Sequence, residues 1–486
     1  MPQRYDVVVI GTGLGGLTAA ALLARAGRKV LVIERNTSVG GAASTYKSGD
    51  LLIEGALHET ADARNPADPK HHVLKRIGIL DAIEWVPTGA LYEVRGGPVG
   101  APFLLPDGFA KAGAALTARF PATRAGIATV LGEIERVAAS DVSRSGEGRS
   151  LAAVLDSAFG DDEGAKCALA ANLAYYHDDP VSLAWPFFAA AQGSYIATGG
   201  AFIRGGSQRL SNALRRAIQA AGGEVMLKRK ASELRLGGDD RPESVVHTDR
   251  AGGDPIVVEA AVVVSNAAPA VLAAMLDEPA RQRLHAAFAG RPLSVSLFSA
   301  TFGLSQAATE FGLTSYSTIL LPAWMRRLAD YPRGVDLLRA ADPDNAPVLT
   351  IANYSAIDAG LGGPPFPVSV FGLDRIENWA GFAGEDYERQ RTRVLDAIKI
   401  AIDRAFPGFA AHVVAAALNT ASSMSSYLNA TQGAIYGFAP LSGAPDRSPE
   451  TPIPGLYLAS AYSGGGGFTG AIGGGAAAAD RILSEA

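Results

Sequence analysis

The chain has 486 residues, enough for two or three domains with hydrophobic cores, and its 48% hydrophobic and 19% charged content is typical of globular proteins. A net charge of −5 without a Lys- or Arg-rich run argues against nucleic acid as a partner, and the single cysteine, Cys167, excludes an internal disulfide and indicates a reducing compartment. No apolar run reaches the roughly 18 uncharged residues of a membrane-spanning helix, and glycines interrupt the first apolar run too early for a signal peptide, so we expect a cytoplasmic protein.

The first 34 residues predict a βαβ unit. It comprises a buried strand at 6–10 (DVVVI), an Ala/Leu-rich helix at 14–26 and a second buried strand at 29–33 (KVLVI). Between the first strand and the helix, Gly11, Gly13 and Gly16 satisfy the GxGxxG pattern, which allows a tight turn, close approach to a pyrophosphate and close helix–strand packing. Glu34 is placed to accept hydrogen bonds from a ribose, and an acid at this position argues against NADP.

The residues after the second strand decide which dinucleotide is expected. Glu34–Arg35 is followed by NTSVGGAAS, with Gly40 and Gly41 about five residues beyond the βαβ unit. This order resembles the FAD-binding domain of the phytoene desaturase, carotenoid isomerase and amine oxidase superfamily, in which the second glycine pair lies along the cofactor. The resemblance implies FAD contacts at Gly11, Gly13, Leu14, Gly15, Gly16, Glu34, Arg35, Gly40, Gly41 and Ser44.

A second part of the cofactor domain is expected near residue 205. Gly205 and Gly206 precede an amphipathic helix, and strand character resumes at EVMLKRKASELRL, with further strands around 244–249 and 256–264. The same order of a Gly-Gly turn, a helix and a strand bracketing the adenine is found in the family. By this match Ala231 stands where the family usually has valine.

A third part is expected at the C-terminal end, where residues 454–475 are PGLYLASAYSGGGGFTGAIGGG. A buried strand, a glycine loop and an Ala-rich helix at 471–483 resemble the family's flavin segment, which implies contacts at Ser460, Gly467, Phe468 and Thr469. Ser460 replaces the family's usual glycine, and the loop lacks its usual proline. No strand and acidic residue follow the helix, so a second, NAD-binding unit is not expected, and we expect oxygen or a quinone as the electron acceptor.

The predicted fold class is α/β: a discontinuous Rossmann-like FAD-binding domain of the glutathione-reductase type plus an α+β substrate domain with a helical part. The predicted FAD-binding segments are 1–90, 196–268 and 426–486, and the predicted substrate-domain segments are 91–195 and 269–425. Within the substrate domain we expect helices at 112–138, 150–172, 278–290 and 387–405, and strands at 293–302, 347–353 and 367–372.

Two segments of the substrate domain are rich in apolar and aromatic residues. The aromatic side chains of 174–202 are either ordinary core or, as the resemblance implies, the wall of a tunnel toward the flavin. Residues 318–328 (TILLPAWMRRL) suggest a surface helix, with an interfacial helix that contacts a membrane from the cytoplasmic side as the alternative.

Candidate catalytic groups are few. His58 and Glu59 lie in a stretch, residues 51–66, that should cross near the flavin ring, and their alternative is a hydrogen-bonded structural pair. Tyr427 and Tyr436 lie in a stretch that resembles the one leading to the other side of the flavin, and Tyr436 is the catalytic candidate we retain. The seven histidines show no metal-ligand spacing, so no metal is expected.

The resemblance implies an FAD-dependent oxidoreductase that acts on an apolar small molecule, such as a carotenoid- or retinoid-like polyene, by desaturation with hydride transfer to flavin N5. A double-bond isomerase or saturase is the alternative within the family. The sequence also leaves open an amine oxidase and a non-catalytic FAD-binding scaffold. Cys167 lies far from the C-terminal flavin segment, so FAD is expected to be bound without a covalent link.

Overall fold

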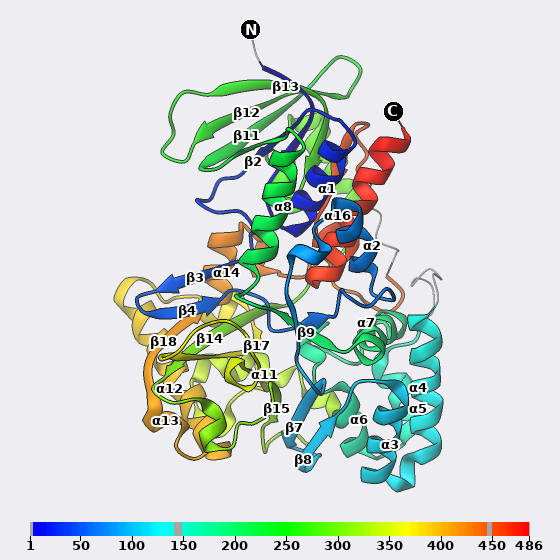
Figure 1. Ribbon diagram of the computed structural model, residues 1–486, viewed down its shortest axis with the longest axis vertical. Helices are drawn as coiled ribbons and strands as arrows, with labels where there is room; N and C mark the ends of the chain where they lie inside the picture. The colour runs from blue at the N-terminus through cyan, green and yellow to red at the C-terminus, as the bar shows by residue number, and fades with distance from the viewer. Residues whose placement is uncertain (1–2, 140–147, 445–449, 486) are drawn as a thin grey trace.

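Three separated stretches of the chain contribute parallel strands to one sheet in the upper part of the molecule (Figure 1). The structure is a computed structural model, and it describes residues 3–139, 148–444 and 450–485. The parallel strands are β10 (Glu224–Met226), β2 (Val30–Ile33), β1 (Gln3–Ile10), β13 (Ile256–Ser265) and β19 (Leu456–Leu458). On the edge away from β1, the first half of β13 pairs antiparallel with β12 (Pro242–Asp249), and β12 pairs antiparallel with β11 (Arg229–Leu236). The predicted α/β fold with a discontinuous Rossmann-like domain is confirmed.

Helices cover both faces of this sheet. One face carries α8 (Gln208–Ala220), α1 (Leu14–Arg25), α16 (Gly467–Ser484) and α2 (Pro69–Ile77), side by side (Figure 1). The other face carries α9 (Pro269–Ala273) and α10 (Glu278–Phe288). Alternate residues of β1 serve the two sides, since Val7 and Val9 pack toward α1 while Val8 and Ile10 pack toward α9. Burial on both faces explains the unbroken apolar runs in the sequence.

A second sheet forms the core of the lower part. Its order is β18 (Val413–Asn419), β14 (Ser296–Leu304), β17 (Phe366–Asp374), β16 (Leu349–Asn353), β15 (Ser317–Leu321), β7 (Tyr92–Gly96) and β8 (Gly100–Leu105). Adjacent strands are antiparallel except β15 and β7. The long helix α12 (Gly384–Ala405) packs beside β18 with α13 (Phe409–His412). Between the two parts lies a small sheet of β5 (Thr60–Ala61), β9 (Gly200–Ile203) and β6 (Trp85–Pro87).

A group of helices completes the lower part opposite α12 (Figure 1). It contains α3 (Phe109–Arg119), α4 (Arg124–Ala138), α5 (Leu151–Phe159), α6 (Glu163–Ala170) and α7 (Trp185–Thr198). The continuous helices expected at 112–138 and 150–172 are each two helices. The predicted helix 112–138 is interrupted before Pro121, which has no backbone N–H to donate. The predicted helix 150–172 is interrupted at Gly160, whose φ is +57°.

The helix expected at 318–328 is wrong. Residues 317–321 are strand β15, which is paired on both edges inside the second sheet. Beyond Pro322 the chain turns inward, where Met325 is buried and the Trp324 ring nitrogen donates to the Ala346 carbonyl at 2.9 Å. The apolar side chains that suggested a membrane contact therefore pack within the protein. Among the described residues, no helix is both long and apolar enough to cross a membrane.

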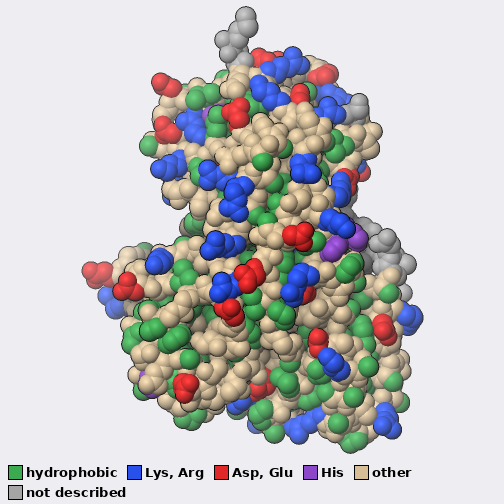
Figure 2. Space-filling model, viewed as in Figure 1, with side chains coloured by type: hydrophobic (Ala, Val, Ile, Leu, Met, Phe, Trp, Pro, Cys, Tyr) green, Lys and Arg blue, Asp and Glu red, His purple; other side chains and the backbone are tan. Residues whose placement is uncertain are grey.

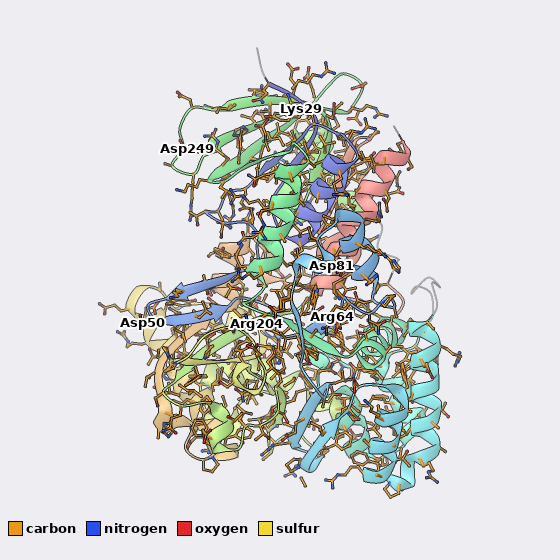
Figure 3. The ribbon with its side chains drawn as sticks, in the orientation of Figure 1. Lys29, Asp50, Arg64, Asp81, Arg204 and Asp249 are labelled. Carbon is orange, nitrogen blue, oxygen red and sulfur yellow. The ribbon has the colours of Figure 1, made fainter. Side chains whose placement is uncertain are left out.

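Charged side chains of both signs gather over the junction between the upper and lower parts (Figure 2). Arg204, which directly follows β9, lies at this junction (Figure 3), and it pairs with Asp358 at 3.2 Å and with Glu84 at 3.6 Å. These partners are solvent-exposed, so each pair contributes little to stability.

Candidate functional site

A cavity of about 1110 Å³ lies where the two parts meet. A cleft for one drug-sized ligand measures roughly 300–1,000 Å³, so this cavity has room for a large ligand or for two ligands end to end. Its upper wall comes from the loops at Gly13 and Gly40 and from the start of α16, and its lower wall from α7, β14 and β17. The predicted residues that line it are Gly13, Leu14, Gly40, Gly41, His58, Glu59, Tyr436, Ser460, Gly467, Phe468 and Thr469.

The two N-terminal glycine segments lie side by side in the upper wall. Gly13 and Gly40 form a parallel bridge, and the Gly40 amide donates to the Thr12 carbonyl at 2.9 Å. Gly40 has a φ of +119°, and a Cβ there would lie 2.3 Å from the Ala43 carbonyl oxygen, so only glycine fits. Helix α1 starts at Leu14 with no side-chain cap and no acidic residue in its first turn. Its free N–H groups and positive dipole end suit a diphosphate, so this cradle fits a dinucleotide.

Asn266, at the end of β13, braces this cradle and was not predicted. Its Oδ1 accepts from the Gly13 amide at 2.9 Å, and its Nδ2 donates to the Ala459 carbonyl at 2.6 Å. It thereby joins the N-terminal and C-terminal glycine segments. Its place directly after the apolar run VVVS (262–265) was the available signal, because polar residues that follow parallel strands gather at the ligand-binding edge of such sheets.

The C-terminal segment supplies the opposite end of the upper wall. Ser460 is buried and caps the short helix α15 (Ala461–Gly464), which gives it a structural use where the family usually has glycine. Helix α16 then begins at Gly467, again without a side-chain cap or an early acidic residue. The Thr469 hydroxyl accepts a hydrogen bond of 2.8 Å from the Lys70 ammonium group, another residue that was not predicted.

The carboxylate of Glu34 lies next to the first glycine loop rather than in the cavity wall. It is buried, and it accepts from the backbone amides of Thr12 at 3.0 Å and Asn36 at 2.7 Å. Arg35 points elsewhere: it donates to the carbonyls of Ser426 (2.8 Å) and Tyr427, at the C-terminal end of α14 (Ala421–Leu428). Tyr427 itself is exposed and does not line the cavity.

The Gly205–Gly206 turn also lies outside the cavity wall, and it packs against the buried carboxylate of Glu54. A Cβ on Gly206 would lie 2.1 Å from the Thr45 hydroxyl. Glu54 accepts from that hydroxyl at 2.7 Å and from the Ser207 amide at 2.8 Å, and its burial raises its pKa. The turn therefore ties α8 to the β3 (Thr45–Ser48) and β4 (Leu51–Glu54) hairpin.

The remaining predicted cofactor residues are internal. Gly11 and Gly16 pack under the first loop, where a Cβ on Gly16 would lie 2.4 Å from the Gly11 carbonyl oxygen. Gly15 packs against the Ala459 carbonyl, and a Cβ on Gly15 would lie 2.3 Å from that oxygen. Ser44 is buried, and Ala231 is buried in β11 against the upper sheet.

His58 and Glu59 lie together in the lower wall, surrounded by aromatic rings. The His58 ring is edge-on to Tyr175, Tyr316 and Phe371, with centroid distances of 5.8, 5.8 and 5.2 Å. Burial lowers the pKa of His58 to about 3, so its imidazole is neutral. Burial raises the pKa of Glu59 to about 8, although hydrogen bonds from Tyr175 (3.2 Å) and Thr88 (3.3 Å) oppose this shift. At neutral pH most of this wall is therefore uncharged.

Tyr436 lies between this wall and the start of α16. A Cβ on Gly466 would lie 2.5 Å from the Tyr436 Cβ, so the ring packs directly on the helix N-terminus. Burial raises the pKa of its hydroxyl, which stays protonated. Within the described ranges, no group of three His, Cys, Asp or Glu side chains could hold a metal ion.

The far end of the cavity reaches the surface between α3 and α4. Lys111 near the start of α3 and Glu135 near the end of α4 line this end, and both are exposed. Between them and His58, the wall is built from the Phe187, Ala190, Ala191, Ser194 and Tyr195 face of α7. Part of the aromatic segment 174–202 thus lines an apolar passage. Trp185 and Phe188 of the same segment are instead buried in the core.

Comparison with known proteins gives one family. A family model described as flavin containing amine oxidoreductase matches residues 14–301. A solved structure of putrescine oxidase, a triple mutant with redesigned cofactor binding, aligns over the whole of both chains with a TM-score of 0.67 and 16% identity. At this identity the likeness concerns the fold alone.

Curated relatives match over short segments. The all-trans-retinol 13,14-reductase of Macaca fascicularis is 38% identical over 96 residues, which are 19% of this chain and 15% of that protein. A component of the limonene dehydrogenase of Castellaniella defragrans is 65% identical over 58 residues, which are 12% of this chain and 10% of that protein. The matches span only about a tenth to a fifth of the relatives' own length.

Proposed function

The chain belongs to the family of flavin-containing amine oxidoreductases and is an FAD-dependent oxidoreductase, and from this premise we propose that it acts on carbon–carbon bonds of an uncharged, largely apolar substrate such as a polyene. The observation that carries the proposal is the passage from α3 and α4 to His58, whose walls are mostly apolar or aromatic and where burial holds His58 and Glu59 mainly neutral. An ammonium group entering it would lose its water without meeting an ionised partner, at a high cost in free energy.

We propose that the upper wall holds the cofactor along its length. The N–H groups at the start of α1 would bind the diphosphate, and Gly40 and Gly41 would lie along the chain that leads to the flavin. Glu34, beside the first glycine loop and outside the cavity wall, would accept from an adenosine ribose that lies beyond this wall. The start of α16, with Gly467, Phe468 and Thr469, would take the flavin end, where a positive dipole favours negative charge. Gly205, Gly206, Ser44 and Ala231 would support this cradle from behind, and Arg35 would hold α14 in place.

FAD, when bound, supplies a two-electron acceptor that takes a hydride equivalent from carbon in desaturation and returns it in saturation. The protein's part is to position and desolvate the substrate. The apolar face of α7 aligns a long molecule along the passage and excludes water. Glu59, with a pKa of about 8, is mostly protonated at neutral pH, so in saturation its carboxyl group would donate the proton that accompanies the hydride. In desaturation the ionised fraction of Glu59 would accept the proton that leaves carbon. Tyr436 stays protonated and offers a hydroxyl donor.

Two further reactions have specific support. Saturation of a double bond is favoured by the retinol reductase match, and it uses the same bound groups in the reverse direction. Amine oxidation is favoured by the fold shared with putrescine oxidase. The neutral inner wall weighs against it, because an amine arrives at neutral pH mostly as a cation.

The test is anaerobic mixing of the FAD-loaded protein with all-trans-retinol, limonene, putrescine and cyclohexylamine, while the oxidised flavin absorption band is followed. Bleaching by a polyene or terpene but not by an amine is the expected result. Bleaching by the amines alone would overturn the proposal. If only the chemically reduced protein responds, by reoxidation with the polyene, the reaction is saturation, and a changed double-bond geometry without net redox identifies an isomerase. A flavin that responds to none of these and does not reoxidise in air would indicate a scaffold.

A further inference from the structure

His58 is a buried polar side chain of the inner cavity wall whose ring nitrogens lack a partner among the described residues. His58 lines the cavity with only 7% of its surface exposed, and neither Nδ1 nor Nε2 has a hydrogen-bond partner within the described structure. A neutral imidazole presents one N–H donor and one acceptor nitrogen. Leaving both unpaired in a buried place costs free energy, so the site is incomplete without a polar atom from another molecule.

The polar groups around His58 are already engaged. The Tyr175 hydroxyl donates to Glu59 Oε1 at 3.2 Å, and the Tyr195 hydroxyl donates to the Glu59 carbonyl at 3.2 Å. The Tyr316 hydroxyl donates to the His58 backbone carbonyl. These bonds engage the hydroxyls of Tyr175, Tyr195 and Tyr316, whereas the two imidazole nitrogens of His58 have no partner among the described residues.

We propose that His58 binds a single hydroxyl or carbonyl oxygen at one end of an otherwise apolar substrate, so that the oxygen sets how far the molecule enters the passage. The inference rests on the proposed function and narrows its substrate class. Three facing rings, Tyr175, Tyr316 and Phe371, leave room for little besides a flat or slender group, and a neutral imidazole does not compensate a charged one. A hydroxyl pairs with either ring tautomer, whereas a carbonyl pairs with the N–H alone.

The experiment measures dissociation constants from the perturbation of the flavin spectrum in the FAD-loaded protein. The probes are all-trans-retinol, the corresponding aldehyde, and the hydrocarbon with the same carbon skeleton and no oxygen. We expect the alcohol or the aldehyde to bind about tenfold or more tightly than the hydrocarbon. His58→Phe keeps a ring and removes both nitrogens, so it should abolish this preference, and His58→Asn, which keeps a donor and an acceptor, should retain part of it.

Phe371→Leu is the matched control, since it alters the same wall without removing a polar atom, and it should weaken all three probes by similar factors. Equal binding of the alcohol, the aldehyde and the hydrocarbon by the unmodified protein would overturn this inference alone, whatever the variants do. A preference that survives His58→Phe would overturn it as well. If none of the three probes binds, both the proposed apolar substrate and the role of His58 are wrong.

Discussion

The Lys70 ammonium group donates a hydrogen bond of 2.8 Å to the Thr469 hydroxyl, which lies 399 residues further along the chain. Lys70 belongs to α2 and Thr469 to the first turn of α16, so the bond fixes the start of the helix that forms one end of the cavity. Lys70 also pairs with Asp68 at 2.8 Å, and neither side chain has any exposed surface. Burial lowers the pKa of Lys70, and the negative charge of Asp68 opposes that shift.

Replacing one partner of this buried pair should be costly. Lys70→Met leaves Asp68 as an uncompensated buried charge, so we expect a loss of about 3–5 kcal/mol in the free energy of unfolding. Denaturant titration of the FAD-loaded protein measures it. Adding Asp68→Asn removes the stranded charge and keeps an oxygen that can cap α2, where Asp68 accepts from the Lys70 amide at 2.7 Å. The double variant should recover part of the loss, and a double variant no more stable than Lys70→Met would contradict this account.

Gly13→Ala should release the cofactor. The φ of Gly13 is −61°, which alanine adopts freely, but its Cβ would lie 2.4 Å from Asn266 Oδ1 and would displace that brace. We expect FAD to bind at least about tenfold more weakly, equivalent to about 1.4 kcal/mol. Gly27→Ala is the control, because its φ of +85° imposes strain while nothing lies within 4 Å of the added Cβ. It should lower stability by about 1–2 kcal/mol and leave the FAD content unchanged; a Gly13→Ala protein that retains full FAD would refute the cradle.

Glu59 should make stability depend on pH. Its folded-state pKa of about 8 lies above the value of 4.5 for an unperturbed carboxyl, so the folded state keeps a proton that the unfolded state releases. Stability from this group is complete below pH 4.5 and is lost as the pH rises toward 8, by at most about 1.4 kcal/mol per pH unit. Glu59→Gln cannot ionise, so its stability relative to the unmodified protein should rise between pH 5 and pH 8. Parallel denaturation curves at each of these pH values, with a constant difference, would show that Glu59 is ionised in the folded state.

Arg35→Met separates two roles for this arginine. In the structure its guanidinium holds the carbonyls at the end of α14, and a cation at a helix C-terminus contributes about 0.3–1 kcal/mol. We therefore expect a stability loss of that size with one FAD per chain retained, measured by thermal unfolding and flavin absorbance. Loss of FAD would instead support the direct contact that the family resemblance implies.

The glycine loops and the buried parallel strands could be predicted, because each of them restricts which residues its own short segment can contain. The spacing of Gly13, Gly40 and Gly467 from the flanking strands is enough to predict that they line one cavity, in which Gly13 and Gly40 form a bridge. The apolar runs of β1, β2 and β13 also predict strands correctly, because these strands are buried on both faces. The fold class follows from these strands and from the order of the segments.

Other features depend on contacts that no local pattern encodes. Lys70 looks like an ordinary polar residue at a helix start, and only the position of Thr469, a distant residue, makes it a buried partner. The segment 318–328 has the composition of an amphipathic helix, and its pairing with β7 and β16 overrides that preference. Likewise, Thr45 and Glu54 lie too close to Gly206 for any side chain there, and this contact exists only because the β3–β4 hairpin folds back onto α8.

The last parallel strand, β19, and the helix α16 are supplied by residues 456–484. A nascent chain still attached to the ribosome therefore lacks one edge of its upper sheet and one end of the cradle until those residues have emerged. We therefore expect the cradle to bind FAD stably only once residues 456–484 have folded against the earlier segments.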